Sequence, residues 1–171
     1  VGFHVEGPFL NGAPGFIGAH EPKYVRPANL KDAERLLEAG AGLVKLFTLA
    51  PEQDEGAAVT KHLVDQGVVV SAGHCDPSLD QLKAAVDNGL SMVTHFGNGC
   101  PVNLPRHDNV LQRFLSLRDH LWFCFIPDGA HVEFLALQNY LDLVGITHAI
   151  MTTDAISAAK LGPGLHEISG M

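Results

Sequence analysis

The chain has 171 residues, of which 46% are hydrophobic and 18% charged, a composition typical of one globular domain with a sizeable core. The net charge of −8 and the absence of a basic cluster argue against nucleic acid or an anionic membrane as a partner, because both bind positively charged surfaces. No apolar run approaches the ~20 residues of a membrane span. The cysteines Cys75, Cys100 and Cys124 form no paired motif, which favours a reducing cytoplasm as the location.

Short apolar runs alternate with amphipathic segments along the whole chain. The apolar runs predict β-strands at about 2–6, 42–49, 67–73, 90–95, 121–127 and 147–153. The amphipathic segments predict helices at about 29–39, 53–66, 77–88, 109–119 and 132–144. This alternation predicts an α/β fold with a parallel sheet. We see no linker or internal repeat, so residues 1–171 are expected to form a single domain.

Four of the predicted strands end at a residue that can bind a metal or carry a proton: Glu6, His74, His95 and Asp154. Two architectures place such residues at the carboxyl ends of strands, an open doubly wound sheet and a closed (βα)8 barrel of the TIM type. Side chains from four different strands converge naturally only around a barrel axis, so we favour the barrel. Six strands do not close it, so either two strands lie outside this chain or the sheet is open.

The four residues suit a metal-dependent hydrolase. A carboxylate and two neutral imidazoles, here Glu6, His74 and His95, form a ligand set that leaves a position open for water. Water on such a metal ionises near neutrality and becomes a nucleophile, and Asp154 beside it fits the role of general base and acid. Each residue also has an ordinary explanation. Glu6 suits a salt bridge, a strand-end histidine suits a backbone hydrogen bond, and Asp154 suits a helix cap. A fourth metal ligand is a further functional alternative for Asp154.

Short motifs occur in a characteristic order along nearly the whole chain. They are His4-Val5-Glu6-Gly7-Pro8-Phe9-Leu10-Asn11, Gly18-Ala19-His20, Leu49-Ala50-Pro51-Glu52, Gly73-His74, Thr94-His95, Asn98, Asp128-Gly129-Ala130-His131 and Thr153-Asp154-Ala155. Each motif is weak alone, but the ordered set is specific. It resembles the N-acetylglucosamine-6-phosphate deacetylase family, metal-dependent (βα)8 barrels of the amidohydrolase superfamily.

The resemblance implies the same metal ligands, Glu6, His74 and His95, for one or two divalent ions of zinc or iron per subunit. It makes Asp154 the catalytic acid and base. It further implies that His20 polarises the acetamide carbonyl, and that the sugar phosphate is bound by His131, the backbone around Asn98-Gly99, and Arg106. Arg106 has an alternative reading as a solvated loop residue. The products would be acetate and glucosamine 6-phosphate, formed by a homodimeric cytoplasmic enzyme.

Two departures from the family pattern qualify what the resemblance implies. The segment Phe96–His107 contains Gly97, Gly99, Pro101 and Pro105 where the family has a different phosphate-binding loop. The resemblance further implies that the chain would correspond to strands three to eight of the barrel, without the family's first two strands and its small β-sandwich. Two alternatives to the deacetylase reading follow, an amidohydrolase for an unphosphorylated sugar or a cyclic amide, and a catalytically inactive sugar-binding barrel.

Overall fold

The computed structural model describes residues 1–166 of the chain. Six parallel strands form one curled sheet, in which each strand pairs with the next one along the chain. The strands are β1 (Phe3–Glu6), β2 (Val44–Leu49), β3 (Val69–Ala72), β4 (Leu90–Val93), β5 (Trp122–Phe125) and β6 (Ala149–Met151). All six predicted strands are therefore present, and they form a half-barrel.

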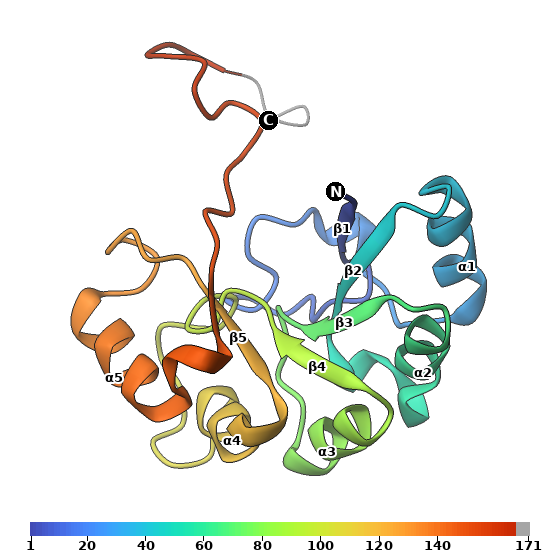
Figure 1. The fold of residues 1–171 in the computed structure, drawn as a ribbon, viewed down its shortest axis with the longest axis horizontal. Coiled ribbons are helices and arrows are strands. Elements are labelled where there is room, and N and C mark those ends of the chain that lie inside the picture. The colour runs from blue at the N-terminus through green and yellow to red at the C-terminus, as the bar shows by residue number, and fades with distance from the viewer. Residues whose placement is uncertain (167–171) are drawn as a thin grey trace.

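The helices cover the outer side of this half-barrel (Figure 1). They are α1 (Leu30–Ala39), α2 (Ala58–Asp65), α3 (Leu79–Asp87), α4 (Val110–Ser116) and α5 (Phe134–Val144). The strand order β1 to β6 contains no reversal, whereas a doubly wound sheet reverses its order at a switch point. The barrel-type α/β fold is therefore confirmed and the doubly wound alternative is wrong. No helix within residues 1–166 combines the length and the apolar character needed to cross a bilayer.

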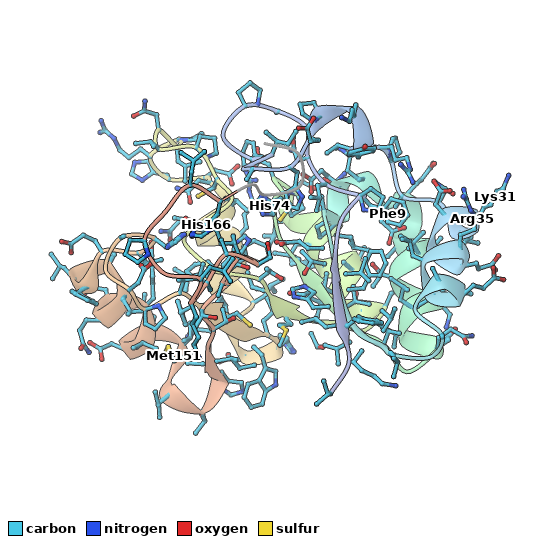
Figure 2. All side chains as sticks on the ribbon, turned by 90° about the horizontal axis from the view of Figure 1, so that it is seen from above. Phe9, Lys31, Arg35, His74, Met151 and His166 are labelled. Atoms are coloured by element: carbon cyan, nitrogen blue, oxygen red, sulfur yellow. The ribbon has the colours of Figure 1, made fainter. Side chains whose placement is uncertain are left out.

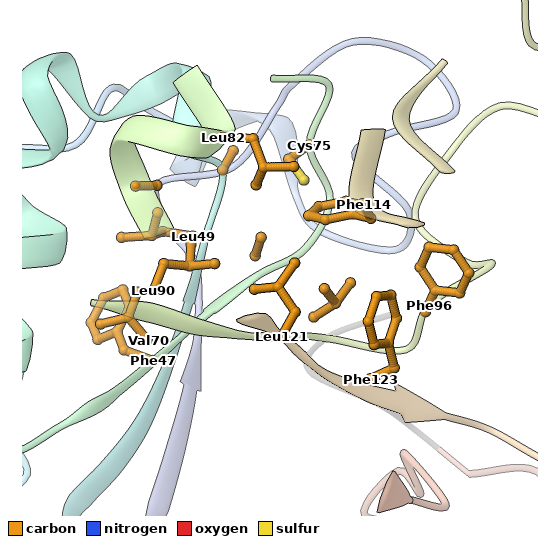
Figure 3. Packing of buried hydrophobic residues seen from close by; sticks show 14 of the residues in the cluster. Phe47, Leu49, Val70, Cys75, Leu82, Leu90, Phe96, Phe114, Leu121 and Phe123 are labelled. Atoms are coloured by element: carbon orange, nitrogen blue, oxygen red, sulfur yellow. The ribbon is translucent and has the colours of Figure 1, made fainter. Parts of the chain in front are cut away.

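The two faces of the sheet differ in chemistry because side chains alternate along each strand. On β2, Phe47 and Leu49 are fully buried in the core between sheet and helices. Thr48 lies between them in the sequence and belongs to the opposite, concave face, where it is hydrogen-bonded to other polar side chains. Figure 3 shows Leu82 of α3 and Phe114 of α4 in the same apolar cluster as Leu49. The apolar core thus holds the strands in place, and the concave face is left for polar residues.

Helix boundaries follow side-chain caps. Asn29, Ser78 and Asn109 accept backbone N–H bonds at the starts of α1, α3 and α4, as such residues do at helix N-termini. The helix predicted over 53–66 begins later, at Ala58, because two short 3₁₀ turns, Pro51–Gln53 and Glu55–Ala57, come first. The buried Asp54 carboxylate binds the N–H groups of Val59 and Thr60 and fixes this late start.

Candidate active site

Three side chains from three different strand ends meet at the centre of the concave face. The Oε1 atom of Glu6 lies 3.0 Å from Nε2 of His95 and 3.2 Å from Nε2 of His74. The two Nε2 atoms are 3.1 Å apart. Figure 2 shows His74 near the middle of the molecule, while Lys31 and Arg35 of α1 lie at its edge. Glu6, His74 and His95 form a group that could hold a metal ion.

The arrangement of these atoms fits a divalent cation. The Nδ1–H group of His74 donates to the carbonyl oxygen of Phe16 over 2.6 Å, so in the neutral imidazole the Nε2 lone pair faces Glu6 and His95. Second hydrogen bonds of this kind fix the tautomer of metal-binding histidines. Ligands at about 2.0–2.1 Å from a tetrahedral ion lie about 3.3 Å from one another, close to the observed separations. The donor set suits zinc and also suits iron.

The pKa values of Glu6 and His74 depend on the hydrogen bonds within this group. Burial raises the pKa of Glu6, but hydrogen bonds from His74 and His95 outweigh burial and hold that pKa far below its usual range. Burial lowers the pKa of His74, but its bonds to Glu6 and to the Phe16 carbonyl oxygen outweigh burial and raise the pKa overall. The carboxylate is therefore ionised at neutral pH and attracts positive charge, whether a proton on an imidazole or a metal ion.

The backbone is left-handed at three of the predicted site residues other than glycine. The φ angles are 49° at His74, 32° at His95 and 47° at Asp154. Residues other than glycine rarely adopt this backbone conformation. Residues that do adopt it cluster at functional sites, where the surrounding structure maintains the strain. In each case the left-handed residue comes two or three positions after the last residue of a strand. The pattern separates these three residues from ordinary strand-end positions.

Two glycines bring backbone against the imidazole of His74. A Cβ atom on Gly18 would lie 2.7 Å from Cε1 of His74, and one on Gly99 would lie 3.2 Å from its Nδ1. Both glycines have positive φ angles, 60° and 62°. Gly99 would also meet Cε1 of His95 at 3.2 Å. A side chain at Gly18 would collide with His74 and one at Gly99 would crowd both histidines, so the two loops pack closely against His74 and His95.

These residues border an open cleft of about 330 Å³, within the size range of small-ligand sites. The predicted residues that line it are Glu6, His20, His74, His95, Asn98, Gly99, His131 and Asp154. His20 lies beside the group, with Nε2 4.0 Å from Oε2 of Glu6 and its ring 4.6 Å from that of His74. Burial, and then the charge of His74, lower the pKa of His20. Asp154 is exposed and also lines the cleft.

One predicted residue lies elsewhere. Arg106 is exposed in the loop between β4 and α4 and is not among the residues that line the cleft.

The structure also shows a hydrogen-bond partner of His131 that the sequence did not predict. The Asp128 carboxylate binds Nδ1 of His131 at 2.6 Å and accepts two backbone N–H bonds. These bonds lower the pKa of Asp128 to about 2. The three-residue spacing of Asp128 and His131 in the sequence was the signal that could have predicted this pair, because an aspartate commonly binds backbone N–H groups two or three residues further along the chain.

Comparisons with known proteins agree with the predicted resemblance. A deacetylase for N-acetylglucosamine 6-phosphate from Bacillus subtilis is 31% identical over 170 residues, which cover 99% of this chain. The Danio rerio enzyme of that name is 32% identical over 98% of the chain. A third relative, 27% identical, is an N-acetylgalactosamine-6-phosphate deacetylase of Escherichia coli O157:H7. All three of these relatives are amino-sugar-phosphate deacetylases. No protein-family model matches the chain.

Solved structures give the same result. A Mycobacterium smegmatis N-acetyl-D-glucosamine-6-phosphate deacetylase, as an Asp-to-Ala variant in complex with N-acetyl-D-glucosamine-6-phosphate, aligns with a TM-score of 0.87. Its sequence is 31% identical, and the alignment covers 99% of this chain and 43% of that one. This chain spans 42% of the length of the Bacillus and Danio relatives. The likeness therefore concerns the part of those proteins that corresponds to the half-barrel.

Proposed function

We propose that this chain carries the catalytic site of a metal-dependent deacetylase, which hydrolyses N-acetylglucosamine 6-phosphate to glucosamine 6-phosphate and acetate. The observation that carries the proposal is the convergence of Glu6, His74 and His95, whose ligand atoms lie 3.0–3.2 Å from one another. The alignments with the Bacillus and Danio deacetylases, which cover 99% and 98% of this chain, support it. We propose further that residues 1–171 belong to one barrel domain. The homodimer and the cytoplasmic location stay predictions.

The cofactor assignment follows from the ligand atoms. Glu6, His74 and His95 would hold one divalent ion, zinc or iron, and a second ion would need ligands beyond this group. When bound, such an ion lowers the pKa of a water molecule and polarises an acyl oxygen. The remaining steps of hydrolysis depend on residues around the ion, which must move one proton and orient the amide.

Asp154 is the proposed general base and then the general acid. It is on the cleft wall with the three ligands, and as a carboxylate it can accept a proton from the attacking water. The water oxygen bonds to the acyl carbon, the C–N bond breaks, and the same proton passes from Asp154 to the departing nitrogen. His20, whose lowered pKa keeps the imidazole neutral at pH 7, would donate an N–H bond to the acyl oxygen.

The sugar phosphate would lie across the rest of the cleft. We assign its contacts to His131, to the polar backbone at Asn98 and Gly99, and to Arg106. Asp128 would orient His131, because its carboxylate accepts a hydrogen bond from Nδ1–H and leaves Nε2 free to contact the sugar phosphate. Arg106 would reach the phosphate with the bidentate geometry of a guanidinium, in its own subunit or in a neighbouring one.

The test is amine release by the purified, metal-reconstituted protein. It is offered N-acetylglucosamine with and without the 6-phosphate, and N-acetylgalactosamine 6-phosphate, the sugar named for the Escherichia coli relative. Asp154→Asn is the matched control, because it keeps the shape of the side chain and removes the base.

Three results would separate the proposed function from its alternatives. Strong preference for N-acetylglucosamine 6-phosphate, lost in Asp154→Asn, supports the proposal. Preference for the unphosphorylated sugar or for the galactose epimer would keep the hydrolase and overturn the substrate. Sugar binding without any turnover, in a preparation with stoichiometric metal, would favour the inactive sugar-binding barrel.

A further inference from the structure

A chain of short hydrogen bonds runs across four strands just below the ligand group. Nε2 of His4 on β1 is 2.7 Å from Oγ1 of Thr48 on β2. Oγ1 of Thr48 is 2.7 Å from Oγ1 of Thr94, which follows β4. Oγ1 of Thr94 is in turn 2.7 Å from Oγ of Ser71 on β3. Thr48 and Ser71 are fully buried and Thr94 nearly so, on a face where the proposed reaction assigns them no part.

Each of the three proposed ligands is next to this chain of hydroxyl groups, through the sheet register, the sequence or the packing of a neighbouring residue. Thr48 is the register partner of Glu6 in the β1–β2 ladder and of Ser71 in the β2–β3 ladder. Thr94 directly precedes His95 in the sequence. The third ligand, His74, follows Gly73, which is packed between the two threonines. A Cβ atom at Gly73 would lie 2.8 Å from Cγ2 of Thr48 and 3.0 Å from Cβ of Thr94.

The hydrogen bonds have one direction that uses every hydroxyl proton. Ser71 donates to Thr94, Thr94 donates to Thr48, and Thr48 donates to the Nε2 lone pair of His4. In the opposite direction the Ser71 hydroxyl would have no acceptor within the described part of the chain. A buried hydroxyl proton that has no acceptor costs about 1–3 kcal/mol. The network is therefore a single ordered chain, and each member fixes the rotamer of the next.

We propose that Thr48, Thr94 and Ser71 are positioning residues for the metal: they hold the ends of β1 to β4 so that Glu6, His74 and His95 stand at coordination distance. This inference rests on the proposed metal binding of those three residues. In this proposal the hydroxyl groups are not themselves ligands of the metal. Their effect is on the affinity and geometry of the ion, because ligand atoms must lie within about 0.2 Å of their proper distances.

The experiment removes single hydroxyl groups and measures the metal rather than the reaction. Thr48→Val and Thr94→Val keep the branched shape and delete the hydroxyl, while Thr48→Ser and Thr94→Ser keep the hydroxyl. Thr60→Val is the control, because Thr60 is fully buried on α2 and its hydroxyl has no partner within residues 1–166. Zn²⁺ affinity is measured by chelator competition, ligand geometry by the visible spectrum of bound Co²⁺, and stability of the metal-free protein by urea unfolding.

We expect both valine variants to bind Zn²⁺ about tenfold or more weakly, in the range seen when indirect partners of a metal site are removed. Their Co²⁺ spectra should shift, and the serine variants and Thr60→Val should resemble the wild type. The double valine variant should lose less than the sum of the single losses, because the two hydroxyls share one bond.

The proposal is overturned if the valine variants lose stability but keep the wild-type Zn²⁺ affinity and Co²⁺ spectrum, or if Thr60→Val weakens Zn²⁺ binding equally. A wild-type protein that binds Zn²⁺ but deacetylates no amino sugar refutes the proposed function, while the valine variants still decide the positioning role. A wild-type protein without Zn²⁺ affinity overturns both.

Discussion

Replacing Gly18 by alanine should damage the metal site through a single methyl group. The new Cβ atom would lie 2.7 Å from Cε1 and 3.1 Å from Nδ1 of His74. Ordinary van der Waals contact begins at 3.4 Å, so the ring or the loop must move by about 0.7 Å, well beyond the ~0.2 Å tolerance of metal–ligand distances.

Either movement disturbs His74. If the ring moves, its Nε2 atom leaves the position that faces Glu6 and His95. If the loop moves instead, it carries the carbonyl oxygen of Phe16 away, and the 2.6 Å hydrogen bond that fixes the His74 tautomer is lost. Loss of such a second bond typically weakens metal binding by about 10–100-fold, and we expect a loss in this range for Gly18→Ala.

The matched control is Gly67→Ala. Gly67 has a similar left-handed φ angle of 75°, but a Cβ atom there would meet nothing within 4 Å. Both variants should lose about 1–2 kcal/mol of unfolding free energy from the left-handed backbone, and only Gly18→Ala should lose Zn²⁺ affinity. Urea unfolding and chelator competition measure the two quantities. Equal Zn²⁺ affinities for the two variants would refute the reasoning.

Three further predictions concern other parts of the chain. Asp54→Ala deletes the acceptor of two buried N–H bonds at the start of α2 and should lower the unfolding free energy by about 2–3 kcal/mol; a loss below about 0.5 kcal/mol in urea would contradict this. The pKa of Asp128 is lowered from 3.8 to about 2, so its ionised form stabilises the fold above pH 3.8 and this effect disappears as the pH falls toward 2. The stability deficit of Asp128→Asn should therefore shrink over that interval in acid titrations, and a constant deficit would exclude the link to His131. Arg106→Ala should change stability by less than about 0.5 kcal/mol, because the side chain is exposed, yet raise KM for the phosphorylated sugar; an unchanged KM would remove Arg106 from the phosphate site.

The fold could be predicted from the sequence because its signals are local. Apolar runs that end at Gly73-His74 or Thr94-His95 mark both the strand and the place where it stops. The sheet then brings the carboxyl ends together without further information. The late start of α2 was not predicted, since a buried aspartate cap and a left-handed turn at Gly56 override a helical hydrophobic pattern that extends further toward the N-terminus.

The supporting parts of the site were harder to predict because they arise from contacts between distant segments. Thr48 and Thr94 look like ordinary β-branched strand residues, and only the sheet register shows that their hydroxyls meet. The role of the Phe16 carbonyl oxygen has no sequence signal at all, since every residue has such an oxygen. The sequence shows a glycine at position 18, but it does not predict the contact with His74, which depends on the path of the loop.

The most direct test of the account is to measure bound metal and amine release from N-acetylglucosamine 6-phosphate in one preparation, before chelation, after chelation and after readdition of Zn²⁺ or Fe²⁺. We expect about one ion per chain, loss of activity in proportion to the ion removed, and recovery on readdition. Glu6→Gln, which removes the charge shared by His74 and His95, should neither retain the ion nor recover. Full activity in a preparation stripped of metal would exclude a metal-dependent deacetylase.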